Sequence, residues 1–141
     1  MTSPGRDSGA ASPAELARGS FGAGRFASVA GEVRSAKWAV VLILTNEEPY
    51  LLPYEMVFHH EGDSWVEVSG SDTPGWRSTG NGRGFVTFWA EAPDNASQVT
   101  VSYGGGSAVV PVSHGYFLAV FWDVGENEFD PDALPEVTAL A

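Results

Sequence analysis

Short apolar stretches separated by turn residues run through the chain from Trp38 to Val124. Residues 38–44 and 116–124 are almost continuously apolar and rich in β-branched and aromatic side chains, and both are too short to cross a membrane as helices. Alternate residues of a strand face opposite sides, so both faces of these two segments are apolar and both need cover. The pattern therefore predicts two buried strands at the centre of the fold.

Further strands are predicted at 54–60, 65–68, 85–90, 98–103 and 107–112. Residues 61–64 close a hairpin, and the glycines at 104–106 and 115 make the last three strands a consecutive antiparallel series. Seven to eight short strands with no long helix predict an all-β, antiparallel two-layer sandwich, with immunoglobulin-like or similar topology. An obligate dimer, a docked N-terminal arm or a partly closed barrel would account for the strands that are apolar on both faces.

The ends of the chain are predicted to lie outside this sandwich, which we assign to residues 25–124. Residues 1–24 form a flexible, largely disordered arm, within which Ser12 and Glu15 have the spacing of a helix capping box. Residues 125–141 form an acidic, extended tail. Within the sandwich, we expect Trp38, Phe88, Leu118 and Val120 to be almost fully buried.

Composition narrows the class of protein. The 141 residues are 43% hydrophobic, which suffices for one core without disulfides, and the absence of cysteine excludes thiol chemistry and cysteine-bound metals. The net charge of −11 makes nucleic-acid binding unfavourable, and solubility explains the acid excess better than a cationic partner does.

With no recognisable signal peptide or membrane span, we expect a cytoplasmic location, or export if the chain is a trimmed piece of a longer one.

Three groups of residues resemble catalytic or metal sites only in part. His59 and His60 are followed by acids, but neighbours on a strand face opposite sides, so a solvated hairpin end is favoured over a metal site. His114 with Ser113 or Ser102 lacks a nucleophile elbow, and a turn histidine is favoured. The acids after residue 122 lack the EF-hand pattern, so a solvated tail is favoured over calcium binding. We therefore predict no catalytic residues, no metal and no cofactor.

The stretch from Gly70 to Gly84 is the longest without an apolar pattern and predicts a loop of about fifteen residues. It carries Trp76 beside Arg77 and Arg83, the only cations after Lys37. An exposed tryptophan with two arginines suits a partner carboxylate or a planar group, so these three residues are the predicted binding site. The alternative is that Trp76 folds back onto the core and the arginines pair with local acids.

Residues 85–124 also carry a recurring strand pattern. An Ala92-Pro93 turn precedes alternating Val99–Val101, a glycine turn, a second strand at 110–112 and the Gly-aromatic-Phe series of 115–122. This pattern resembles an uncharacterised actinobacterial immunoglobulin-like β-sandwich module. The resemblance covers under a third of the chain and implies a fold but no function.

These observations favour a non-enzymatic interaction domain that binds a protein partner. The alternative is a structural subunit of a homo-oligomer or larger assembly, joined through an apolar sheet face. Neither hypothesis requires nucleic acid or a membrane span.

Overall fold

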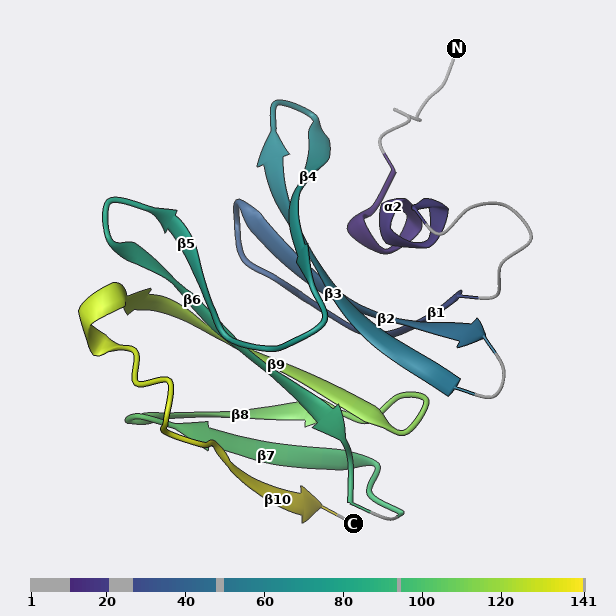
Figure 1. The fold of residues 1–141 in the computed structure, drawn as a ribbon, viewed down its shortest axis with the longest axis vertical. Coiled ribbons are helices and arrows are strands. Elements are labelled where there is room, and N and C mark those ends of the chain that lie inside the picture. Colours follow the sequence, from purple (N-terminus) through teal and green to yellow (C-terminus); the bar gives the residue numbers. More distant parts are fainter. Residues whose placement is uncertain (1–10, 21–26, 48–49, 94, 141) are drawn as a thin grey trace. The chain divides into compact units, whose positions relative to one another are not determined.

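The structure is a computed structural model that describes residues 11–20, 27–47, 50–93 and 95–140. The chain divides into two compact units, Met1–Ser71 and Asp72–Ala141. Both are built from antiparallel strands (Figure 1). The first unit has one sheet and the second has two, and each unit has its own hydrophobic cluster.

The first unit is one four-stranded sheet with a short helix. Its strands lie in the order β1-β2-β3-β4, so each strand pairs with the one that follows it in sequence. Alternation places Ala39, Val41 and Ile43 on one face of β2 and Val40, Leu42 and Leu44 on the other, and all six are buried. The elements are α2 (Pro13–Gly19), β1 (Ala27–Arg34), β2 (Trp38–Glu47), β3 (Tyr50–Glu61) and β4 (Ser64–Ser71).

Helix α2 forms where the capping-box spacing predicts it. The hydroxyl of Ser12 accepts a hydrogen bond from the backbone N–H of Glu15, and the Glu15 carboxylate accepts one from the N–H of Ser12. A helix of seven residues is marginal alone, but Ala17 is fully buried against Ala39, Val41 and their neighbours in the sheet. Docking on this face of the sheet therefore stabilises the helix.

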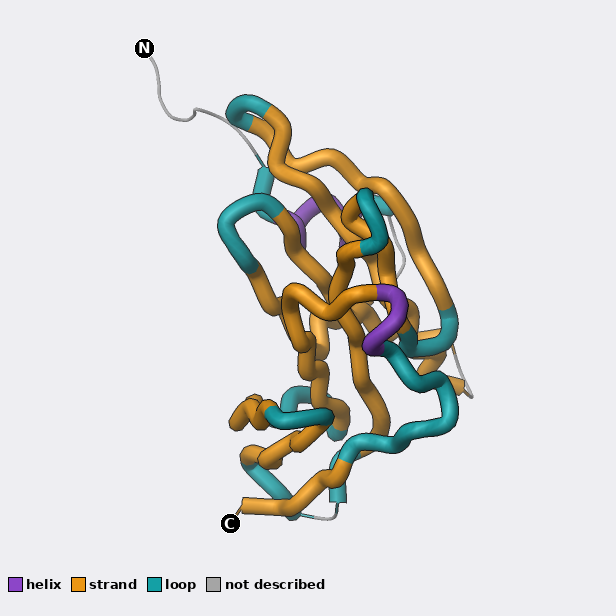
Figure 2. Tube along the Cα trace, turned by 90° about the vertical axis from the view of Figure 1, so that its left-hand side faces the viewer, coloured by secondary structure: helices purple, strands orange, loops and turns teal. Residues whose placement is uncertain are grey.

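The second unit is a two-layer sandwich of three-stranded sheets, ordered β5-β6-β9 and β10-β7-β8 (Figures 1 and 2). Val99, Val101 and Val110 of one sheet pack against Phe117 and Ala119 of the other. The elements are β5 (Trp76–Gly80), β6 (Arg83–Glu91), β7 (Gln98–Tyr103), β8 (Gly106–Pro111), β9 (Tyr116–Gly125), the single-turn helix η1 (Glu126–Glu128) and β10 (Glu136–Leu140).

Strand β9 pairs with β6 and not with β8. The β7–β8 hairpin is confirmed, but the chain then turns at His114-Gly115, where both residues have positive φ, and crosses to the opposite sheet. The expectation that 98–124 forms three consecutive paired strands is wrong for the third. An apolar pattern on both faces does not say which neighbour a strand takes.

The predicted all-β antiparallel sandwich is confirmed, with ten strands in the described part of the chain instead of seven to eight. Leu118 and Val120 are buried as predicted, whereas Trp38 and Phe88 are only half-buried. Trp38 lies against the ring of His59, at a centroid distance of 4.5 Å. Phe88 is half-buried because it borders an apolar hollow in the second unit.

The boundaries differ from those predicted. Most of the predicted flexible arm, residues 1–10 and 21–24, lies outside the described residues. The chain divides after Ser71, inside the range assigned to one sandwich domain. Residues 125–141, predicted as an extended tail, include η1 and strand β10, which pairs with β7 from Glu136↔Ser102 to Leu140↔Gln98.

Candidate binding pocket

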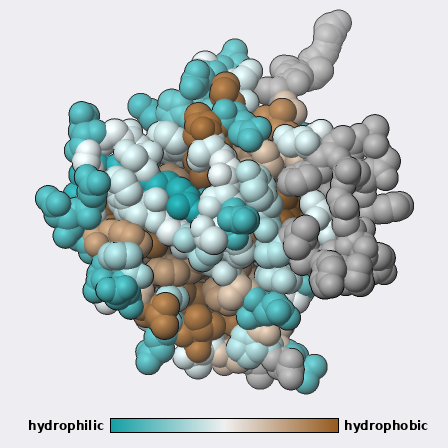
Figure 3. All heavy atoms as spheres, viewed as in Figure 1, coloured by the Kyte–Doolittle hydropathy of each residue, from teal (hydrophilic) through white to brown (hydrophobic). Residues whose placement is uncertain are grey.

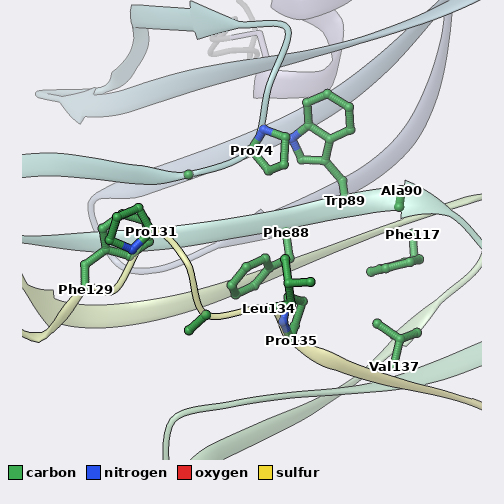
Figure 4. Close-up of a pocket in the computed structure, with 12 residues that line it drawn as sticks. Pro74, Phe88, Trp89, Ala90, Phe117, Phe129, Pro131, Leu134, Pro135 and Val137 are labelled. Carbon is green, nitrogen blue, oxygen red and sulfur yellow. The ribbon is translucent and has the colours of Figure 1, made fainter.

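An apolar pocket of about 290 Å³ lies in the second unit, between the strands and the segment that follows η1 (Figure 4). No charged side chain lines it. Strand β6 supplies Phe88, Trp89 and Ala90, and Phe117 comes from β9. The remaining lining residues come from the stretch before β5 and from the C-terminal segment: Pro74, Gly75, Phe129, Pro131, Ala133, Leu134, Pro135 and Val137.

Aromatic rings fix one side of the pocket. The ring of Phe88 lies 4.9 Å from that of Tyr103 and 6.0 Å from that of Phe121, and the latter two rings are 5.9 Å apart. Tilted and edge-on arrangements at these distances are favourable for aromatic pairs. The three rings come from β6, β7 and β9, so both sheets hold Phe88 in place.

Hydrogen bonds to β6 hold the short stretch before β5. The N–H of Gly75 donates to the hydroxyl of Thr87 at 3.1 Å, and the N–H of Thr87 donates to the carbonyl of Gly75 at 2.8 Å. Thr87 is fully buried. Pro74 and Gly75 are thereby fixed at the pocket wall.

The C-terminal segment, residues 129–137, forms another wall of the pocket (Figure 4). At its start, the carboxylate of Glu128 accepts a hydrogen bond of 2.6 Å from the N–H of Gly125. The N–H of Asp130 donates to the Tyr103 hydroxyl at 3.4 Å, and at its far end the segment joins β10, which pairs with β7. Between these anchors, Phe129 and Pro131 alternate with the acids Asp130 and Asp132, and the consecutive residues Ala133, Leu134 and Pro135 all line the pocket.

Leu134 stands at the rim of this pocket. Its side chain is 87% exposed, the highest value among the exposed large hydrophobic side chains of the described residues. Leu134 and Ala133 also line a second, more polar hollow of about 400 Å³, together with Tyr103, Asp130 and Glu136. In the space-filling view, hydrophobic atoms reach the surface over β10 and the segment before it (Figure 3).

The predicted loop from Gly70 to Gly84 is instead the end of β4, a short connection and the β5–β6 hairpin, so the loop prediction is wrong. The hairpin turns at Asn81-Gly82, both with positive φ, as a two-residue turn requires. A Cβ at Gly84 would lie 2.0 Å from the carbonyl oxygen of Arg77, so glycine allows the close approach of β5. Asn-Gly is a strong hairpin signal. Strand β5 was not predicted because it contains the polar residues Ser78 and Thr79 and therefore lacks an apolar pattern.

The structure places all three predicted binding residues on this hairpin. Trp76 is half-buried, and its indole N–H donates to the carbonyl of Val124 at 2.9 Å. Arg77 donates to the backbone carbonyls of Thr73 and Trp76. The binding role of Trp76, Arg77 and Arg83 stays a prediction.

Arg83 is held by acids of its own unit. Its guanidinium lies 2.7 Å from the Asp123 carboxylate and 3.4 Å from that of Glu128, and it also donates to the Asp123 carbonyl. The hydrogen bond to Asp123 raises the pKa of Arg83. Asp123 has a φ of 60° at a β-bulge, so Arg83 binds both the side chain and the backbone of a residue in a disfavoured conformation.

None of the three histidines lines this pocket, and His59 and His60 belong to the first unit. His59 contacts Trp38 and the carboxylate of Glu61, while the ring of His60 lies 4.7 Å from that of Trp65. His114 occupies a turn, with a φ of 53°. Within residues 11–20, 27–47, 50–93 and 95–140, no group of three metal-ligating side chains is placed to hold an ion.

Sequence reasoning missed the pocket residues after Phe129. One pattern pointed to them, the alternation of apolar residues with acids in Phe129-Asp130-Pro131-Asp132-Ala133. The prolines and the acidic composition of this stretch instead favoured an extended tail. No helix in the described ranges is long and apolar enough to span a membrane. Comparisons with family models, with curated proteins and with solved structures found no match.

Proposed function

We propose that this chain is a non-enzymatic binding domain that captures a protein partner by taking one of the partner's large apolar side chains into the pocket beside Phe88. The observation that carries the proposal is a pocket with an entirely uncharged lining, bordered by a leucine that is 87% exposed. When a partner covers an exposed leucine and fills an apolar hollow beside it, apolar surface is removed from water, which favours binding.

The volume of the pocket suits a small apolar group such as one side chain. At about 290 Å³, it lies at the lower limit of the range of about 300–1,000 Å³ that small-molecule sites usually enclose. Hot spots of protein interfaces are aromatic or large aliphatic side chains in well-packed pockets near the centre of the contact. The rings around Phe88 and the prolines at 74, 131 and 135 provide such surroundings.

A peptide series tests this function. A soluble peptide with one central phenylalanine, Gly-Ser-Gln-Phe-Gln-Ser-Gly, is compared with the same peptide carrying alanine, while amide NMR follows the protein. Burial of an aromatic side chain contributes about 1.5–3 kcal/mol, so we expect the phenylalanine peptide to bind at least about tenfold more tightly. The shifts should centre on Ala133, Leu134 and Phe88.

Two exposed residues provide matched variants. Leu134→Ser should weaken the phenylalanine peptide several-fold while unfolding free energy changes by less than about 0.5 kcal/mol, because the side chain is exposed. Val109→Ser is the control, since Val109 is 58% exposed and does not line the pocket. Equal binding of both peptides, or equal loss in both variants, would refute the proposal.

Self-association is the alternative function, and β4 is the strand that favours it. Val66 and Val68 are 41% and 48% exposed on this edge strand. Exposed apolar edge strands are templates for pairing with a second chain. Sedimentation of the peptide-free protein separates the two functions. A domain that binds another protein should sediment as a monomer at every concentration, whereas a self-associating chain should form larger species as the concentration rises.

A further inference from the structure

The second hollow, which shares Ala133 and Leu134 with the apolar pocket, carries acidic groups without cationic partners. Asp130 and Glu136 line it, and no cation among the described residues pairs with either. One carboxylate oxygen of Asp130 accepts the N–H of Asp132 at 2.9 Å, which fixes the side chain without neutralising it. Both residues are exposed, so a partner can reach their carboxylates.

A third hollow on the same unit provides a contrast. It measures about 360 Å³ and contains Asp123 and Glu128, but the guanidinium of Arg83 pairs with both carboxylates. Its acids therefore hold the β9–η1 turn. Glu128 also lines the second hollow, so among the acids of these two polar hollows Asp130 and Glu136 are the ones that no cation of the described residues pairs with.

The apolar pocket and this acidic hollow adjoin each other. They share Ala133 and Leu134, and the tilted rings of Phe88 and Tyr103, whose centroids are 4.9 Å apart, line one hollow each. A segment seated beside Phe88 can therefore place its neighbouring residues near Asp130 and Glu136. The unit as a whole has nine acidic and two basic residues, a formal charge of −7, which favours the approach of cations.

We propose that the partner segment is basic, with a lysine or arginine next to the apolar side chain that enters the pocket. This inference rests on the proposed function and adds the charge of the partner. The uncharged lining of the pocket favours an apolar side chain. The carboxylates of Asp130 and Glu136 favour a basic residue next to that side chain in the partner. Charge complementarity of this kind acts on specificity and association rate more than on total affinity.

Three peptides that differ only beside the anchor test the inference: Gly-Ser-Lys-Phe-Lys-Ser-Gly, the glutamine version and the glutamate version. Exposed ion pairs are weak, so we expect the lysine peptide to bind about two- to tenfold more tightly than the glutamine peptide, and the glutamate peptide more weakly than both. The difference should shrink as ionic strength rises, since salt screens exposed charges.

Charge-neutralising variants locate the effect. Asp130→Asn combined with Glu136→Gln should abolish most of the preference for lysine while leaving the glutamine peptide unchanged, and asparagine can still accept the N–H of Asp132. Glu126→Gln removes a nearby charge that lines none of the three hollows, and the preference should survive it. Equal affinities for the three peptides, or a preference lost equally in the control, would overturn the inference.

The two proposals fail in different ways. If the glutamine peptide binds better than its alanine counterpart but lysine adds nothing, the pocket function stands and the basic partner is refuted. If no phenylalanine peptide binds better than its alanine counterpart, the pocket function itself fails. Binding of lysine peptides with and without phenylalanine at equal affinity would show a purely electrostatic surface and would refute both.

Discussion

The two units of the chain contain similar numbers of residues but use them differently. In the first, every strand pairs with the next along the sequence, and one helix covers a face that contains Ala39, Val41, Ile43, Met56 and Phe58. In the second, β6 pairs with β9, and β10 returns to pair with β7, so its sheets depend on contacts between distant residues. Local pairing costs less chain entropy than such long-range pairing.

The two units also differ in the side chains that pack in them. Aliphatic residues of β2 fill both faces of the first sheet, whereas large rings of β6, β7 and β9 meet at angles in the second unit and border a hollow. The proposed binding pocket lies in this second unit, whose core is assembled from remote parts of the chain.

The largest expected effects come from truncating one buried side chain in each unit. Phe58→Ala should cost about 3–5 kcal/mol and Leu118→Ala about 2–5 kcal/mol, because the side chains are 1% and 3% exposed. Urea denaturation followed by NMR signals from both units measures each loss. A loss below about 0.5 kcal/mol at Leu118 would show that the β6–β9 sheet is not packed as described.

A smaller effect should come from Gly84→Ala, which places a Cβ against the backbone of Arg77 and pushes β5 away from β6. We expect about 1–3 kcal/mol of destabilisation in the same assay. Gly105→Ala is the matched control, because a Cβ there meets nothing within 4 Å and its φ is not positive. Equal costs at both glycines would contradict the close approach of β5.

The smallest effect concerns helix α2. Hydrogen bonding to Ser12 lowers the pKa of Glu15, so the ionised carboxylate stabilises the folded state above the ordinary glutamate pKa of about 4.3. This stabilisation is lost as the pH falls through the lower folded-state pKa. Ser12→Ala should cost about 1 kcal/mol at neutral pH, and less in acid.

Hydrogen exchange of the α2 amides at neutral pH and at about pH 3 measures this effect. Ser107→Ala, in exposed β8, is the control and should leave the helix unchanged. A cost at Ser12 that does not depend on pH would mean that the Glu15 carboxylate does not take part in the cap.

The sequence by itself determined the features that depend on neighbours along the chain. Alternation and continuous apolar runs located β2, β6 and β9, and the spacing of Ser12 and Glu15 located α2, because strand periodicity and helix capping are local. The binding role assigned to Trp76, Arg77 and Arg83 also came from local composition, and it stays a prediction.

Only the tertiary structure decided which strands pair and where residues 125–140 lie in the second unit. Nothing in the apolar pattern of 116–124 distinguishes β6 from β8 as its neighbour, because its two faces are equally apolar. Arg83 meets Asp123 and Glu128 across some forty residues of sequence, and Phe129 and Leu134 meet Phe88 only because β10 joins β7. The pocket belongs to no single segment, since its walls come from parts of the chain that folding alone brings together.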